Sequence, residues 1–286
     1  MCIRDSPKQD TLIIAGVFNT GFYEFDQNFV FVNINDALSI FDKEENDQNL
    51  EIYLKNPLKA NSFKKEIEAL KLGEGDVFEG EGILAVTKAL LQSGVAYVGG
   101  YQGSPVSNLL DVMVQAKDYM KELGVHVEAC ANESSAAAML GASINYPVRG
   151  AVTWKSIVGT NVASDALSHL ASVGVLGGSL IIIGEDYGEG SSIIQERTHG
   201  VALKSTIWLM DPRPNLEVIV RTVHKAFELS EYSHTPVMMQ LRIRTCHLQG
   251  KFIAKNNIKP QISSTNKVGE VAPHNYDLIA HPPSTY

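Results

Sequence analysis

The chain has 286 residues, of which 44% are hydrophobic and 20% charged, a composition typical of soluble globular proteins. Its formal net charge of -8 argues against a surface for nucleic acid or for an anionic membrane. The three cysteines are far apart and form no C-x-x-C pair, which favours a reducing, cytoplasmic compartment and argues against a cysteine-ligated metal site.

Two further classes are disfavoured by the pattern of residues. The longest apolar run, around residues 180–183, is too short to span a bilayer, and residues 1–6 carry no apolar region of a signal peptide. The eight histidines show no metal-ligand spacing. We therefore expect no metal ligands in this chain and no membrane contact for residues 73–286.

The first quarter of the chain differs from the rest. Residues 12–18, 29–33 and 51–54 predict strands, and residues 35–41 begin like a short helix. After Pro57, apolar residues recur at helical spacing, which predicts an amphipathic helix. We predict a small α+β unit over residues 1–72, which ends at the glycine-rich break of residues 73–76.

The following residues alternate between helix and strand patterns. Predicted helices cover residues 82–93, 106–123, 134–144 and 161–172, and a further helix is capped by Asn215 and runs to residue 229. Predicted strands cover residues 95–98, 125–129, 150–154, 179–184, 207–209 and 236–241.

This alternation predicts an α/β fold with a doubly wound parallel sheet over residues 73–252. The near-continuous apolar run of residues 179–184 is typical of a strand buried on both faces. The strand that starts at Val125 also reads as buried, and residues 236–241 would close the sheet. Residues 253–286 read as a truncated tail or linker.

Three loops follow predicted strands and should meet at the carboxyl edge of the sheet, where α/β proteins bind ligands. They are residues 100–105, 131–133 and 155–161, and residues 186–192 form a fourth. Glycines in the first loop permit close approach of a ligand, although a tight turn is the favoured explanation when they are taken alone. Lys155 before a helix start suits an anionic group, although capping is the alternative. Glu133, taken alone, reads as a structural carboxylate at a helix start.

Two nucleotide-binding motifs are disfavoured. Residues 80–85 fit G-x-G-x-x-A, but that motif needs a preceding strand, and residues 76–79 make a poor one. No G-x-x-x-x-G-K-[ST] sequence is present, which excludes a P-loop.

A resemblance to a known family rests on residues 99–105 (GGYQGSP), Asn132 with Glu133, residues 153–165 and residues 184–192. Residues 211–215 and 236–246 continue it in the same register. Over residues 78–252 the chain resembles the thiamine-diphosphate pyrimidine-binding domain of 2-oxoacid:ferredoxin oxidoreductases, and most of all the indolepyruvate enzymes.

The resemblance implies a role for each matching residue. Glu133 would be catalytic: it would hydrogen-bond N1′ of the aminopyrimidine and favour the imino tautomer that removes the thiazolium C2 proton. The implied cofactor-binding residues are Gly100, Ser104, Pro105, Asn132, Lys155 and Asn161. The implied reaction is oxidative decarboxylation of an aryl pyruvate, with the acyl group passed to coenzyme A and electrons passed to ferredoxin.

The chain departs from the family in two respects. It lacks the G-D-G-type motif that binds diphosphate and Mg²⁺, and it lacks cysteine clusters for iron–sulfur (4Fe–4S) centres. We therefore expect half a site, inactive alone, with the diphosphate-binding domain or subunit elsewhere in an oligomer. The alternative is a non-catalytic thiamine-like domain used for assembly.

The first 70 residues carry a second resemblance. Residues 15–26, 35–38 and 54–57 are similar to the periplasmic domain of lipoprotein-releasing permeases, which would make this part a partner-binding module. The membrane helices of such permeases are not found in the sequence, so the activity is not carried over. Our hypothesis is that two unrelated coding fragments join around residues 71–79.

Overall fold

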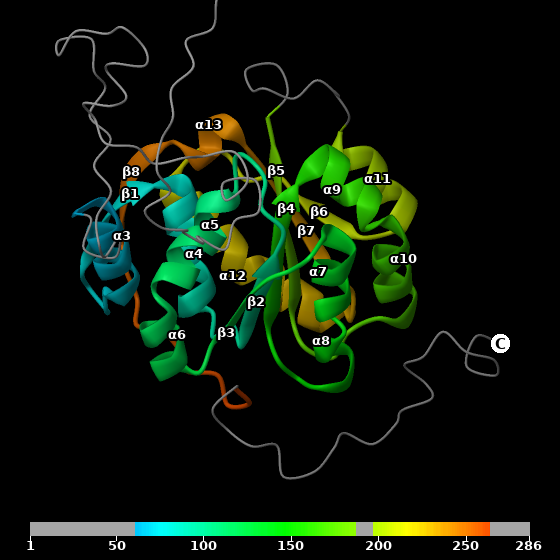
Figure 1. Cartoon of the computed structure of the whole chain (residues 1–286), viewed down its shortest axis with the longest axis horizontal. Coiled ribbons are helices and arrows are strands. Elements are labelled where there is room, and N and C mark those ends of the chain that lie inside the picture. Colours follow the sequence, from blue (N-terminus) through cyan, green and yellow to red (C-terminus); the bar gives the residue numbers. More distant parts are fainter. Residues whose placement is uncertain (1–60, 187–196, 264–286) are drawn as a thin grey trace, which may run out of the picture. The chain divides into compact units, whose positions relative to one another are not determined.

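A six-stranded parallel sheet forms the centre of the computed structural model, which describes residues 61–186 and 197–263 (Figure 1). The described residues fall within one compact unit, Asn56–Tyr286. The strands and short helix predicted within residues 1–60, and the parts of the predicted loop and tail in residues 187–196 and 264–286, lie outside the described residues.

The strand order β3-β2-β4-β5-β7-β6, parallel throughout, confirms the predicted doubly wound fold. The strands are β2 (Tyr97–Gly100), β3 (His126–Ala129), β4 (Gly150–Lys155), β5 (Ser179–Glu185), β6 (Trp208–Met210) and β7 (Val237–Arg242). Two predictions about position were wrong. β7 lies between β5 and β6 and does not close the sheet, and β3 is a largely exposed edge strand.

Helices cover both faces of the sheet (Figure 1). One layer consists of α3 (Asn61–Lys71), α4 (Gly82–Gln92), α5 (Ser107–Gln115), α6 (Lys117–Leu123) and α12 (Leu216–Ser233). The other consists of α7 (Glu133–Met139), α8 (Ala142–Asn145), α9 (Ser156–Val162), α10 (Ser164–Val173) and α11 (Thr198–Ser205). Alternate residues of β5 point into the two cores: Ile182 belongs to the first and Ile183 to the second. β5 is therefore buried on both faces, as predicted.

Helix boundaries differ from the predictions in three places. The predicted helix 106–123 breaks at Ala116 into α5 and α6, and the predicted helix 134–144 divides into α7 and α8. The expected loop at residues 155–161 is mostly helical, because α9 already begins at Ser156. The cap at Asn215 is confirmed, since its Oδ1 accepts a hydrogen bond from the backbone N–H of Val218 (3.0 Å).

A two-stranded ribbon lies outside the main sheet. β1 (Val77–Glu81) pairs antiparallel with β8 (Gln249–Ile253), and the rings of Phe78 and Phe252 stack with their centroids 4.5 Å apart. Residues 76–79 were predicted to be a poor strand, which was wrong. β1 is nevertheless not a parallel strand of the main sheet, so the structural context of a dinucleotide site is absent here.

Lys88 of α4 joins three segments of the chain. Its ammonium donates to the backbone carbonyls of Leu70 (3.2 Å) and Leu72 and to Oδ1 of Asn257 (2.6 Å). Burial lowers the pKa of Lys88 to about 8, against the opposing charge of Asp76. α3, which we predicted at the end of the small N-terminal unit, is thus attached to the α/β unit. The segment 254–263, which we call the C-terminal strap, is attached by the same lysine.

Among the described residues, no helix combines the length and apolar character needed to cross a membrane.

Candidate functional site

The carboxyl edge of the sheet brings the predicted loops together. The backbone N–H of Tyr101 donates to the carbonyl of Thr153 (3.0 Å), and that of Cys130 donates to the carbonyl of Gly100 (2.8 Å). A side chain on Gly184 would place its Cβ 2.8 Å from Cδ of Pro105. The loop of residues 101–105 therefore lies across the ends of β4 and β5.

This loop is closely packed against the strand ends. A Cβ on Gly100 would lie 2.4 Å from the carbonyl oxygen of Thr153, so only glycine fits there. A Cβ on Gly103 would lie 2.6 Å from Cβ of Lys155. Pro105 is buried behind a cis peptide bond, whereas Ser104 is exposed. Of the predicted residues in this loop, Ser104 is the one whose side chain faces solvent.

Glu133 begins α7 and lies beneath α9. Its side chain is 6% exposed, and a Cβ on Gly159 of α9 would lie 3.0 Å from its Oε1. No group in the described part of the chain donates a hydrogen bond to its carboxylate. The carboxylate thus packs against Gly159 of α9, and a contact with a ligand stays a prediction for it.

Asn132 and Lys155 are engaged within the protein. Oδ1 of Asn132 accepts hydrogen bonds from the backbone N–H (2.8 Å) and the hydroxyl (3.1 Å) of Ser135, and so caps α7. Nζ of Lys155 lies 2.7 Å from Oδ2 of Asp186, a carboxylate that is 2% exposed. Both side chains thus bind other groups of the protein, and a contact with a ligand stays a prediction for each.

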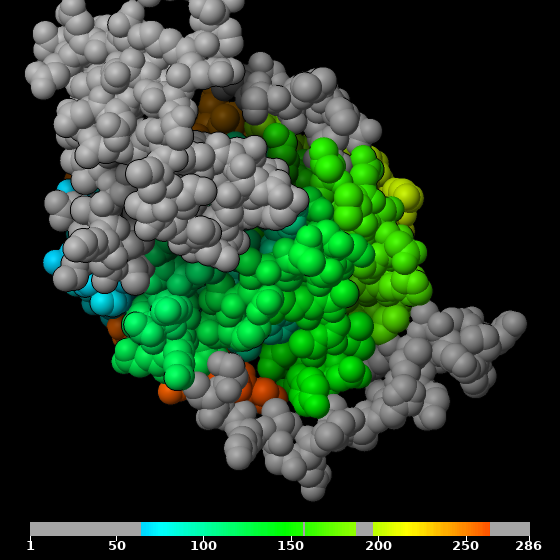
Figure 2. Space-filling view, in the orientation of Figure 1, coloured from blue at the N-terminus to red at the C-terminus, as the bar shows by residue number. Residues whose placement is uncertain are grey.

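The remaining predicted residue is Asn161, which lies on the exposed side of α9. α9 belongs to the layer of green helices on the right-hand part of the face in Figure 2. The structure thus brings Glu133 against α9 and the 101–105 loop against Lys155. Asn161 is not one of the residues that make these two contacts.

Two acidic residues at this edge were not among the predicted site residues. Glu185 ends β5 and Asp186 follows it, and both are buried. A signal was present in the sequence, because two adjacent acidic residues end an otherwise apolar strand. Within the described ranges, no group of three or more His, Cys, Asp or Glu side chains is placed to hold a metal ion.

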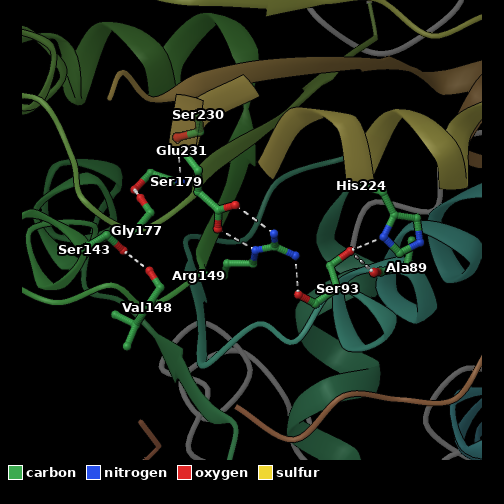
Figure 3. A network of polar contacts seen from close by, with 10 residues as sticks. All are labelled: Ala89, Ser93, Ser143, Val148, Arg149, Gly177, Ser179, His224, Ser230 and Glu231. Carbon is green, nitrogen blue, oxygen red and sulfur yellow. Dashed lines mark hydrogen bonds and ion pairs between the residues drawn. The ribbon is translucent and has the colours of Figure 1, made fainter. Parts of the chain in front are cut away.

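A serine–histidine pair at the opposite edge of the sheet is structural (Figure 3). Ser93 Oγ lies 2.8 Å from Nδ1 of His224 and donates its proton to the carbonyl of Ala89 (2.7 Å). The guanidinium of Arg149 bridges the carbonyl of Ser93 and the carboxylate of Glu231. Because Ser93 is buried and its proton is already committed, this network joins α4, β4 and α12 and does not form a nucleophile.

Two cavities lie away from the candidate edge. One of about 420 Å³ is lined by Tyr97, His126 and Val148, at the amino ends of the strands. Another of about 500 Å³ lies between α12 and the segment around Phe252. Neither is lined by Glu133 or by the loops described above.

Known proteins resemble this chain in sequence. The chain is 30% identical over 183 residues to the indolepyruvate oxidoreductase subunit IorA of Methanothermobacter marburgensis. It is 31% identical over 183 residues to the IorA subunit of Methanothermobacter thermautotrophicus. These similarities support a relationship of the chain to the 2-oxoacid oxidoreductase family. Each match covers 64% of this chain and 29% of the relative, so the chain spans less than a third of the length of these IorA subunits.

A solved structure supports the fold. It is the 2-oxoglutarate:ferredoxin oxidoreductase of Magnetococcus marinus with 2-oxoglutarate, coenzyme A and succinyl-CoA bound, with a TM-score of 0.52 and 15% identity. The likeness covers 67% of this chain and 35% of that one, and at this identity it shows the fold alone. A search of protein-family models finds no match.

Proposed function

We propose that the chain is the pyrimidine-binding half of a thiamine-diphosphate-dependent indolepyruvate:ferredoxin oxidoreductase. The proposal rests mainly on Glu133. This residue is a buried carboxylate at the carboxyl edge of a parallel sheet, and no described residue donates a hydrogen bond to it. The names of the IorA relatives support the substrate class.

The residues of this edge suit an aminopyrimidine. A carboxyl group can share a proton with a ring nitrogen. Glu133 offers such a group, and no described residue donates a hydrogen bond that would compete with the ring nitrogen for it. When bound, the cofactor supplies the thiazolium electron sink for decarboxylation. Glu133 would hold the proton at N1′, and the buried indole of Trp154 with the backbone of Gly159 would keep water away from that contact.

The other predicted residues would shape the site. Gly100 and Pro105 would set the path of the loop, and Ser104 would present its hydroxyl at the surface of the edge. Lys155, held by Asp186, would supply a fixed positive charge. Asn132 would act by fixing the start of α7, and we place Asn161 at the border of the site.

The complete reaction needs further protein. We propose that a diphosphate-binding domain or subunit supplies the Mg²⁺ site, and that iron–sulfur centres outside these residues pass electrons to ferredoxin. The acyl product would be transferred to coenzyme A. This division agrees with the 29% of the IorA length that the chain spans. The chain alone would be inactive, and the working enzyme would be a cytoplasmic oligomer.

The proposal is tested by Glu133→Gln in an enzyme completed with the missing domains. We expect indolepyruvate-dependent reduction of an electron acceptor to fall about 10²–10⁴-fold, the range for loss of a positioned proton-transfer group. The far-ultraviolet circular dichroism should be unchanged. Glu128→Gln is the matched control, because this carboxylate lies at the exposed end of β3. Full activity of Glu133→Gln would refute the role of Glu133.

An assembly role is the second candidate. It is favoured by the structural use of Asn132 as a cap and of Lys155 as an ion-pair partner. In that case the completed enzyme would show no turnover linked to this domain, and Glu133→Gln would match the parent protein in subunit association.

A further inference from the structure

Glu185 is a buried carboxylate for which the proposed mechanism has no use. We infer that it is a positioning residue: it holds helix α9 over Glu133 through a chain of hydroxyl groups. The inference rests on the proposed function, because it gives α9 the task of placing the carboxylate of Glu133.

The first link joins β5 to α11. Glu185 is the last residue of β5 and is 2% exposed. Its Oε1 accepts two hydrogen bonds from Thr198, the first residue of α11, one from the backbone N–H (3.0 Å) and one from the hydroxyl (2.6 Å). The carboxylate therefore fixes both the start of α11 and the direction of the Thr198 hydroxyl.

The second link joins α11 to α9. Because Thr198 gives its own proton to Glu185, its Oγ1 accepts from the hydroxyl of Ser156, which lies 2.8 Å away. Ser156 is the first residue of α9, and both hydroxyls are buried. The three side chains thus form one directed chain from α9 to the carboxylate, and each bond is shielded from water.

The third link joins α9 to Glu133. The backbone of Gly159 lies against the side chain of Glu133, and the hydroxyl of Thr160 accepts a hydrogen bond from Nε1 of Trp154 (3.1 Å). Since Glu133 has no hydrogen-bond donor among the described residues, its contact with Gly159 gives α9 a direct hold on its carboxylate. A displacement of about 1 Å at a reacting group can cost about 10²-fold in rate.

A simpler account gives Glu185 only the task of capping α11. That account explains the bond to the Thr198 N–H, but a serine or aspartate at the helix start would cap it without burying a carboxylate from another strand. It also leaves the bond between Thr198 and Ser156 unexplained. The second carboxylate oxygen of Glu185 has no partner within the described ranges, so the side chain is held by Oε1.

The first test uses the full chain without cofactor. The chain has two tryptophans, and Trp208 is exposed, so Trp208→Phe leaves the buried Trp154 as the reporter of α9. In this background we compare Glu185→Ala with Glu185→Gln, whose amide oxygen can still accept both hydrogen bonds from Thr198. The readouts are the emission of Trp154 and the hydrogen–deuterium exchange of residues 156–162.

We expect Glu185→Ala to shift the emission of Trp154 to the red and to speed exchange in α9 about tenfold or more, the change for a local loss of roughly 1.4 kcal/mol. Glu185→Gln should restore both readouts. Ser230→Ala is the control, because it removes a buried hydroxyl that accepts from the N–H of Ser179 at the other end of β5. Equal effects of Glu185→Ala and Ser230→Ala on α9, or no effect, would overturn the inference.

The second test uses the completed enzyme. We expect Glu185→Ala to lower kcat about 10–100-fold with a much smaller change in KM for the 2-oxoacid, and Glu185→Gln to recover most of kcat. A loss expressed only in KM, or no recovery by Glu185→Gln, would contradict the inference. Full turnover of Glu133→Gln would instead overturn the proposed function, and the exchange of α9 in the unloaded chain keeps the two failures apart.

Discussion

Replacing Lys88 by methionine tests how α3 and the C-terminal strap are attached to the α/β unit. Lys88 is fully buried, and its ammonium donates to two carbonyls at the end of α3 and to the side chain of Asn257 in the strap. Methionine keeps most of the aliphatic volume and removes the charge with its three hydrogen bonds. Stability should therefore fall through lost polar contacts and not through a cavity.

The expected loss follows from the acceptors that remain. The carbonyl of Leu70 keeps a hydrogen bond from Nδ2 of Asn257 (2.8 Å), whereas the carbonyl of Leu72 and Oδ1 of Asn257 lose the donor described for them. A fully buried acceptor without a partner costs about 1–3 kcal/mol, and these two acceptors, which are half-buried, should each cost less than the upper figure. Removal of a buried ammonium offsets part of this cost, so we expect a net loss of roughly 1–3 kcal/mol.

Denaturant unfolding of the full chain, followed by circular dichroism, measures this loss as a lower midpoint at constant m-value. Lys117→Met is the matched control, since Lys117 is an exposed lysine at the start of α6. A loss below about 1 kcal/mol for Lys88→Met, or one equal to the control, would refute the account.

The pH dependence supplies a second check on the same residue. The pKa of Lys88 is about 8 in the folded protein, below the value of about 10.4 for an unfolded lysine. Between these values the unfolded chain binds more protons than the folded chain, so the contribution of Lys88 to stability rises with pH. The difference in unfolding free energy between the parent protein and Lys88→Met should therefore widen as the pH rises from about 7.5 to about 9.5, a window of roughly two pH units. A constant gap would contradict the lowered pKa.

Two further predictions concern packing and pH. Gly82→Ala would place a Cβ 2.0 Å from the carbonyl oxygen of Thr245, so we expect thermal unfolding to show a loss of about 1–3 kcal/mol, whereas Gly200→Ala, with open space around it, should lose nothing. Burial, helped by Lys255, lowers the pKa of His224, so the folded chain resists protonation and stability falls as the pH drops below about 6.5. His224→Gln should lose less stability than the parent protein between pH 7 and pH 5, about the window where histidine titrates, and an equal loss would contradict this assignment.

Much of the candidate site could be located in the sequence, but its internal contacts could not. Loops after successive parallel strands must meet at one edge, so Glu133, Lys155 and the 101–105 loop could be placed together without coordinates. The partner of Lys155 could not, because Asp186 lies 31 residues away and follows a different strand. The same holds for Gly159, which meets Glu133 only because α7 and α9 pack on the same face of the sheet.

The sequence by itself determined the kinds of element and their succession. Three features could be predicted because they depend on residues a few positions apart, whose pattern is visible in the sequence. They are the apolar run of β5, the cap at Asn215 and the helix before residue 72. Only the tertiary structure decided that β3 and β6 are the edge strands, that α9 replaces an expected loop, and that Lys88 joins α3 to the strap. These outcomes depend on which strands pair and which buried polar groups find partners across the fold, and neither is encoded in the local pattern.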